Sequence, residues 1–187
     1  MSLSARVRAS LEESVVLVHA GEYAFTEEME TFKEINLEEN PGIEPALRAE
    51  FGVESIPCLL AYGVPYAVEE IQAVKEIERA RESAKLEGAI EKIRREKRVL
   101  FMKGTPERPE CRFSREFIKI LGEAGVEPRD YVSVNVLESP AVREGIKAYG
   151  DWPTYPQMYA DGELLGGLDV IKAELAKGNL KEYLKLV

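Results

Sequence analysis

Short apolar segments that predict buried strands alternate with amphipathic segments that predict helices, and this alternation occurs twice along the chain. In the second half, strands are predicted over 98–104 and 131–136, with a helix over 111–125 between them. A helix over 139–150, a hairpin over 156–167 with an Asp-Gly turn, and two closing helices come next. Strands that alternate with helices predict an α/β fold in which helices flank a mixed sheet.

The first half predicts a shorter version of the same pattern. It has apolar strand segments over 15–20 and 33–37 and a helical segment that ends at Gly52, a natural helix stop. In each half a strand begins at a proline that follows a helix, Pro57 in the first and Pro156 in the second. We therefore expect the same fold twice.

Two further helices are predicted in the first half. Thr26 is a plausible helix cap, and Glu27 and Glu28 would occupy the first turn, where the helix dipole favours acids. A long, charge-rich helical pattern runs from 68 to 97 and is expected to contain the linker between the halves, around 83–88.

Acidic side chains are concentrated in the first half of the chain. Residues 1–90 carry 8 basic and 18 acidic side chains, a balance of −10, whereas residues 91–187 carry 17 and 16, a balance of +1. This asymmetry favours two domains of different character. It argues against a nucleic-acid partner, because phosphate binding needs a basic face.

The remaining composition narrows the class of protein. No apolar run approaches the 18 or so residues of a membrane span, so no membrane association is expected. Two cysteines, Cys58 and Cys111, do not make a disulfide framework, and the single His19 excludes a His-rich metal site. A compartment that keeps thiols reduced fits best, and we expect the cytoplasm, with a nuclear location also compatible.

Cys111 lies where a proline-punctuated loop becomes a helix, in "ERPECRFSREFIKIL". Unpaired backbone N–H groups at a helix start stabilise a thiolate, the form of cysteine that attacks disulfides and binds metals. Arg112, Arg115 and Lys103 add positive charge, so we expect a lowered pKa for this thiol. Ser114 stands where a partner thiol would be, which removes a local dithiol cycle. The alternative is an ordinary buried cysteine.

Cys58 follows Pro57 directly and has two interpretations. It is either a second redox thiol or a small buried apolar residue of a strand.

Two segments carry a family resemblance. "LFMKGTPERPECRFS" and "VREGIKAYGDWPTYPQMYADGELLGGLD" resemble a monothiol glutaredoxin across nearly all of 91–187. "EINLEENPGIEPALRAEFGVESIPCLLAYG" resembles the latter part of a thioredoxin domain, although "HAGEYAF" stands where a thioredoxin has its two cysteines. The whole resembles the multidomain (PICOT-like) glutaredoxins, with a degenerate thioredoxin-like domain over 1–85 and a monothiol glutaredoxin domain over 86–187.

The resemblance implies two tandem thioredoxin-like folds and a glutathione groove beside Cys111. Lys103, Arg143 and Lys147 would pair with carboxylates of the tripeptide, and a cis Tyr155–Pro156 bond would present the main chain of Tyr155 to its cysteinyl residue. The alternative for Arg143 and Lys147 is a solvated helix face, for Asp169 a helix cap, and for Trp152 a core residue or groove wall. The implied glutathione-binding residues are Lys103, Phe113, Arg143, Lys147, Thr154, Tyr155, Pro156, Gly167, Leu168 and Asp169.

The resemblance also implies a [2Fe–2S] cluster. Such a cluster takes four ligands, commonly thiolates. Cys111 and one glutathione from each of two protomers would supply them, so a cluster-bound homodimer and an apo monomer are expected. The competing hypotheses are a monothiol oxidoreductase that removes glutathione from mixed disulfides, and an adaptor that binds protein partners through the acidic first half.

Two residues depart from the family pattern. Arg112 replaces the glycine of the usual Cys-Gly-Phe-Ser, and its bulk and charge bear on dimer packing around a cluster. Leu168 stands where the family commonly has a cysteine, so any role of that thiol is absent.

Overall fold

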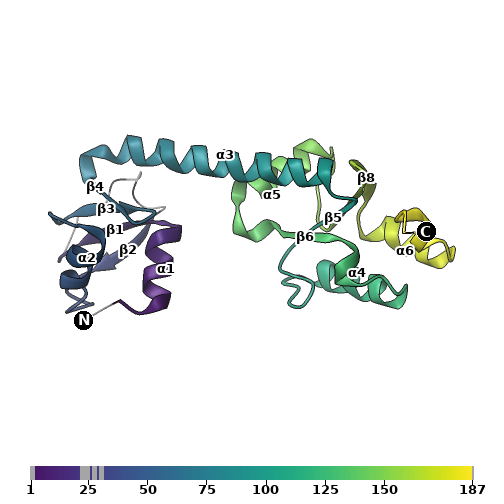
Figure 1. Ribbon diagram of the computed structural model, residues 1–187, viewed down its shortest axis with the longest axis horizontal. Helices are drawn as coiled ribbons and strands as arrows, with labels where there is room; N and C mark the ends of the chain where they lie inside the picture. The colour runs from purple at the N-terminus through teal and green to yellow at the C-terminus, as the bar shows by residue number, and fades with distance from the viewer. Residues whose placement is uncertain (1–2, 22–25, 27–28, 30–31, 187) are drawn as a thin grey trace. The chain divides into compact units, whose positions relative to one another are not determined.

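The computed structural model describes residues 3–186 except 22–25, 27–28 and 30–31 (Figure 1). The chain forms two compact units, Met1–Ala80 and Arg81–Val187. Each contains a four-stranded mixed sheet with flanking helices, and the predicted thioredoxin-like fold class is confirmed. The helix predicted from Thr26 lies largely outside the described residues.

The sheet of the first unit has the strand order β2-β1-β3-β4, in which β1 and β2 are parallel and the other pairs antiparallel. Two elements of this unit, α1 and β4, were absent from the prediction. The described elements are α1 (Ala5–Glu13), β1 (Val15–His19), β2 (Lys33–Asn36), α2 (Glu44–Phe51), β3 (Cys58–Ala61), β4 (Val64–Ala67) and the 3-10 turn η1 (Val68–Glu70).

The sheet of the second unit repeats this arrangement in the order β6-β5-β7-β8, again with the first pair parallel. Its helices and strands agree with the prediction within a few residues at their ends. They are β5 (Arg98–Met102), α4 (Arg112–Glu123), β6 (Val132–Asn135), α5 (Pro140–Tyr149), β7 (Gln157–Ala160), β8 (Glu163–Gly166), α6 (Leu168–Ala176) and α7 (Leu180–Tyr183), with 3-10 turns η2 (Pro128–Asp130) and η3 (Val136–Glu138).

Helix α3 (Ile71–Arg95) contributes to both units and runs unbroken through the predicted linker (Figure 1). Ile71 and Val74 at its beginning are buried in the core of the first unit. Ala89 and Ile93 near its end are buried in the core of the second. Each end of α3 therefore belongs to the apolar core of a different unit.

Burial explains why the central strands have no polar face. All five residues of β1 and four of the five in β5 are buried, because helices cover both faces of each sheet. The turn between β7 and β8 places Asp161 and Gly162 at positive φ (49° and 84°), as the predicted Asp-Gly hairpin requires. Among the described residues, no helix combines the length and apolar character needed to cross a bilayer.

Candidate functional site

A short loop after β5 brings Cys111 to the start of α4. Gly104 adopts a positive φ of 82° and forms an isolated bridge with Pro109. The Glu110 N–H donates to the Lys103 carbonyl (2.9 Å). The loop therefore closes on itself, and Cys111 follows it as the N-cap residue of α4.

The sulfur of Cys111 is half-buried and accepts hydrogen bonds from the helix start. Its Sγ lies 3.3 Å from the Ser114 backbone N and 3.2 Å from Ser114 Oγ. Partial burial raises the pKa of this thiol, but hydrogen bonds from Ser114 and from the Phe113 N–H, together with the charge of Lys103, outweigh that effect. The net pKa is below the ordinary thiol value, as the sequence predicted.

Ser114 is fully buried and connects the thiol to the end of β5. Its Oγ accepts a hydrogen bond from the Lys103 N–H (3.1 Å). A hydroxyl held in this way can donate to a thiolate at Cys111. The Ser114 hydroxyl cannot form a disulfide, and Cys111 is the single thiol of the second unit.

Arg112 was expected to add positive charge at this helix start. Its guanidinium lies 4.5 Å from the ring centroid of Phe113, a cation–π distance. Lys103 is the cation whose charge lowers the pKa of Cys111.

A groove of about 270 Å³ lies next to this helix start. Three of its side chains are cationic, and they come from the end of β5 and from one face of α5. It brings together six predicted glutathione-binding residues and one that the sequence did not predict, Pro153. The lining residues are Lys103, Phe113, Arg143, Lys147, Pro153, Thr154 and Tyr155.

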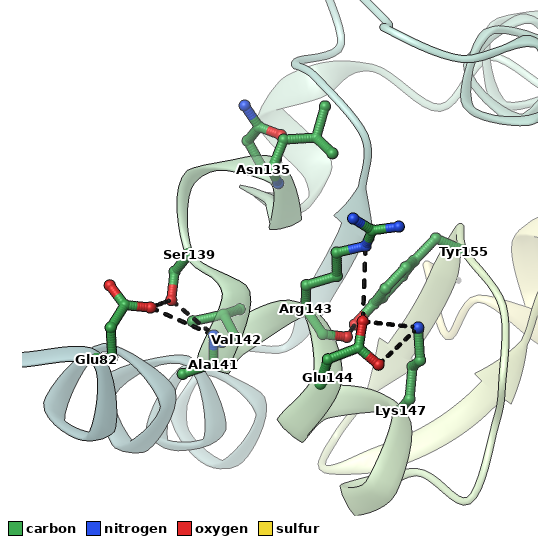
Figure 2. Close-up of polar contacts among 10 residues, drawn as sticks. Glu82, Asn135, Ser139, Ala141, Val142, Arg143, Glu144, Lys147 and Tyr155 are labelled. Carbon is green, nitrogen blue, oxygen red and sulfur yellow. Dashed lines mark hydrogen bonds and ion pairs between the residues drawn. The ribbon is translucent and has the colours of Figure 1, made fainter. Parts of the chain in front are cut away.

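Polar contacts hold α5, the helix that carries Arg143 and Lys147 (Figure 2). Ser139 caps this helix, and its Oγ donates to the carboxylate of Glu82 on α3. The same carboxylate accepts from the Ala141 N–H (3.3 Å). Glu82 was not predicted, because its partners lie 57 and 59 residues away.

A hydrogen bond from Tyr155 holds the backbone of α5 at Arg143. Its hydroxyl donates to the Arg143 carbonyl (2.7 Å). Burial of the ring raises the pKa of Tyr155, so this hydroxyl keeps its proton and remains a donor. The backbone of α5 is thus tied to the wall of the groove.

A second unpredicted acid, Glu144, lies between the two cations of α5. Lys147 Nζ is 2.9 and 3.0 Å from its two carboxylate oxygens, and Arg143 Nε is 3.7 Å from Oε1 (Figure 2). The hydrogen bond from Lys147 lowers the pKa of Glu144. The i,i+3 spacing to Lys147 was a signal that the sequence offered for this pair.

Buried Gln157 supports the loop from Trp152 to Pro156. Its Nε2 donates to the carbonyls of Trp152 (2.9 Å) and Thr154 (3.1 Å), and its Oε1 accepts from the Tyr159 hydroxyl (3.0 Å). The predicted cis Tyr155–Pro156 bond is present. Gln157 was missed as a site residue because its role is to hold the backbone of the groove wall.

The other predicted residues lie outside the groove lining. Gly167 packs against the loop, since an added Cβ would lie 3.1 Å from both the Pro156 carbonyl oxygen and Trp152 Nε1. The side chain of Leu168 is buried in a core cluster, and Asp169 is exposed in the first turn of α6.

Cys58 is a core residue of the first unit. It is 3% exposed and belongs to an apolar cluster with Leu47 and Leu60. Burial raises the pKa of its thiol, and the charge of Arg48 offsets this only in part. Such a thiol is a weak nucleophile. Across the described part of the chain, no three His, Cys, Asp or Glu side chains form a group that could hold a metal ion.

The chain is similar to known proteins through its second unit. A family model described as Glutaredoxin matches residues 99–165. Monothiol glutaredoxin-5, mitochondrial, from Saccharomyces cerevisiae is 52% identical over 87 residues, which are 46% of this chain and 58% of that protein. Probable monothiol glutaredoxin 2 from Rickettsia typhi is 47% identical over 93 residues, 50% of this chain and 81% of that protein.

A longer relative matches more of the chain. Monothiol glutaredoxin-S11 from Oryza sativa is 39% identical over 148 residues, which are 76% of this chain and 28% of that protein. The second unit alone, residues 81–187, makes up a smaller share of the chain than this. The similarity therefore extends into the first unit. The chain therefore spans 58% of the length of the Saccharomyces relative and 28% of the rice one.

Proposed function

Because the chain belongs to the monothiol glutaredoxin family, we propose that it binds glutathione beside Cys111 and carries a [2Fe–2S] cluster as cargo between two protomers. The observation that supports this most is the position of Cys111. A half-exposed thiol of lowered pKa lies beside a groove lined by Lys103, Arg143 and Lys147, in a unit that holds no second thiol.

Ligand counting supports an arrangement shared between chains. One protomer offers one reactive thiolate, and a cluster takes four ligands. Two protomers with one glutathione each complete that number, so we propose a dimer with cluster and a monomer without it. The three groove cations would hold the two carboxylates of each tripeptide, and Tyr155 and Thr154 would form the wall against which it lies.

Reconstitution of the full chain tests this proposal. Iron, sulfide and reduced glutathione are added without oxygen, and visible absorbance, circular dichroism and size on a column are recorded. We expect a coloured dimer that requires glutathione, a colourless monomer for Cys111→Ser, and colour retained in the matched control Cys58→Ala. A colourless wild-type monomer, or colour in Cys111→Ser, would overturn the proposal.

A second candidate is removal of glutathione from mixed disulfides, which the lowered pKa of Cys111 favours. The Cys111 thiolate would attack the glutathionyl sulfur, and the substrate thiol would leave as that S–S bond breaks. Free glutathione would then attack the Cys111–glutathione disulfide, releasing glutathione disulfide and restoring the thiolate. Turnover of a glutathionylated peptide that needs Cys111 but not Cys58 is expected, and no turnover contradicts it.

We also propose a two-domain organisation, with a degenerate thioredoxin-like domain over 1–85 and the glutaredoxin domain over 86–187, as in multidomain (PICOT-like) glutaredoxins. The repeated strand order and the match of the rice relative beyond the second unit support it. The acidic first domain would bind protein partners with basic surfaces. Changing the exposed Glu38, Glu39 and Glu69 to glutamine should weaken partner capture and leave cluster binding unchanged.

We propose the cytoplasm as the location, and the Saccharomyces relative, described as mitochondrial, gives the alternative. Microscopy of the tagged full-length protein distinguishes the two.

A further inference from the structure

Helix α5 places one carboxylate against both of its groove cations. Glu144 contacts Lys147 through both oxygens (2.9 and 3.0 Å) and approaches Arg143 Nε at 3.7 Å (Figure 2). Lys147 and Arg143 both line the groove, whereas Glu144 does not. The groove cations of α5 are therefore already neutralised in part by an acid that is not part of the groove lining.

Exposure indicates that this acid can be displaced. The Glu144 side chain is 67% exposed, whereas that of Lys147 is 26% exposed. Ion pairs at such exposure are weak, and the glutamate loses little when it turns to water. Lys103, the third groove cation, has no carboxylate within ion-pair distance in the described part of the chain. An arriving carboxylate therefore meets one open cation and two that Glu144 already contacts.

We propose that Glu144 is the internal counter-ion of the groove and sets its affinity for peptide carboxylates. With the groove empty, Glu144 takes the place of a ligand carboxylate at Lys147 and Arg143. It turns outward when the ligand binds. This inference rests on the proposed glutathione site and adds to it a residue that weakens binding. The opposite role, in which Glu144 only holds Lys147 in a productive position, predicts the opposite sign.

Calorimetric titration of the full, reduced chain with glutathione tests the sign. Glu144→Gln should bind glutathione about two- to fivefold more tightly than wild type, the range of an exposed ion pair. The control Glu123→Gln removes one charge from an exposed ion pair with Lys119 on α4, and its affinity should match wild type. Thermal unfolding of each variant verifies that the fold is retained.

Salt distinguishes an electrostatic effect from a steric one. Between about 0.01 M and 1 M salt the screening length falls from about 30 Å to about 3 Å, so the gain in Glu144→Gln should largely disappear. A gain that persists at high salt, or equal or weaker binding by Glu144→Gln at low salt, overturns the inference alone. If the wild type binds no glutathione, the proposed function itself fails.

Discussion

The two units share one strand order and differ in the segment that comes after the first strand. In the second unit, β5 leads into the loop and helix start that hold Cys111. In the first unit, the segment between β1 and β2 has no cysteine, and the unit's one thiol, Cys58, is buried within β3. The comparison teaches that buried apolar strands determine this fold, whereas the reactive thiol depends on one loop that can be replaced without changing the sheet.

The corresponding helices α2 and α5 differ in the same direction. The N-cap residue of α2, Ile43, makes no side-chain hydrogen bond. The start of α5 has a capping serine, Ser139, and the carboxylate of Glu82 as well. The unit that carries the groove therefore fixes its helix by specific polar contacts, which apolar packing alone does not provide.

The largest expected difference between the units is in thiol reactivity. We expect Cys111 to react with iodoacetamide about a thousandfold faster than Cys58 at neutral pH, because the reagent reaches Cys58 only when the core unfolds locally. The rate at Cys111 should rise with pH through a pKa below the ordinary thiol value, and that at Cys58 through a raised one. Mass spectrometry of labelled peptides measures both. Equal rates would remove the distinction between the units.

Glycines at positive φ give the next largest difference. At Gly104 an added Cβ would lie 2.3 Å from the Arg108 carbonyl oxygen, whereas at Gly52 it would meet nothing within 4 Å. Gly104→Ala should cost about 2–4 kcal/mol of unfolding free energy, from the backbone strain plus the clash, and Gly52→Ala about 1–2 kcal/mol from strain alone.

Unfolding of each unit can be followed separately in this test. Fluorescence of the single Trp152 reports the second unit, and hydrogen exchange of β1 and β3 reports the first. If Gly104→Ala leaves the fluorescence transition unchanged, the loop does not depend on this close approach.

The smallest effect should come from Glu82. Glu82→Gln should lower the unfolding free energy of the second unit by about 1 kcal/mol, since it weakens charge-assisted bonds to Ser139 and the Ala141 N–H. Glu87→Gln, an exposed glutamate on the same helix, is the matched control and should have no effect. Urea unfolding followed by Trp152 fluorescence measures both, and equal stabilities would show that Ser139 alone caps α5.

The sequence was sufficient for those features that depend on local pattern. Strand and helix positions in the second unit follow from periodicity and turn residues, and the lowered pKa of Cys111 follows from its position at a helix start. The resemblance to monothiol glutaredoxins, and not a local pattern, pointed to Lys103, Arg143, Lys147 and Tyr155, which line one groove.

Other features depend on contacts that no local pattern encodes. Glu82 reaches Ser139 across 57 residues. The contact between the Arg112 guanidinium and the exposed ring of Phe113 was not predicted either. Helix α1, whose start is capped by Ser4, was also absent from the prediction.

Ser114, which occupies the place of a second thiol, determines how an oxidised Cys111 can be rescued. Peroxide would convert the thiolate to a sulfenic acid, and no neighbouring thiol in the unit can condense with it. Glutathione can, with loss of water, and the resulting mixed disulfide is reversible, whereas further oxidation to the sulfinic acid is not. The survival of this cysteine under oxidative stress is therefore set by the supply of a small molecule, not by the protein.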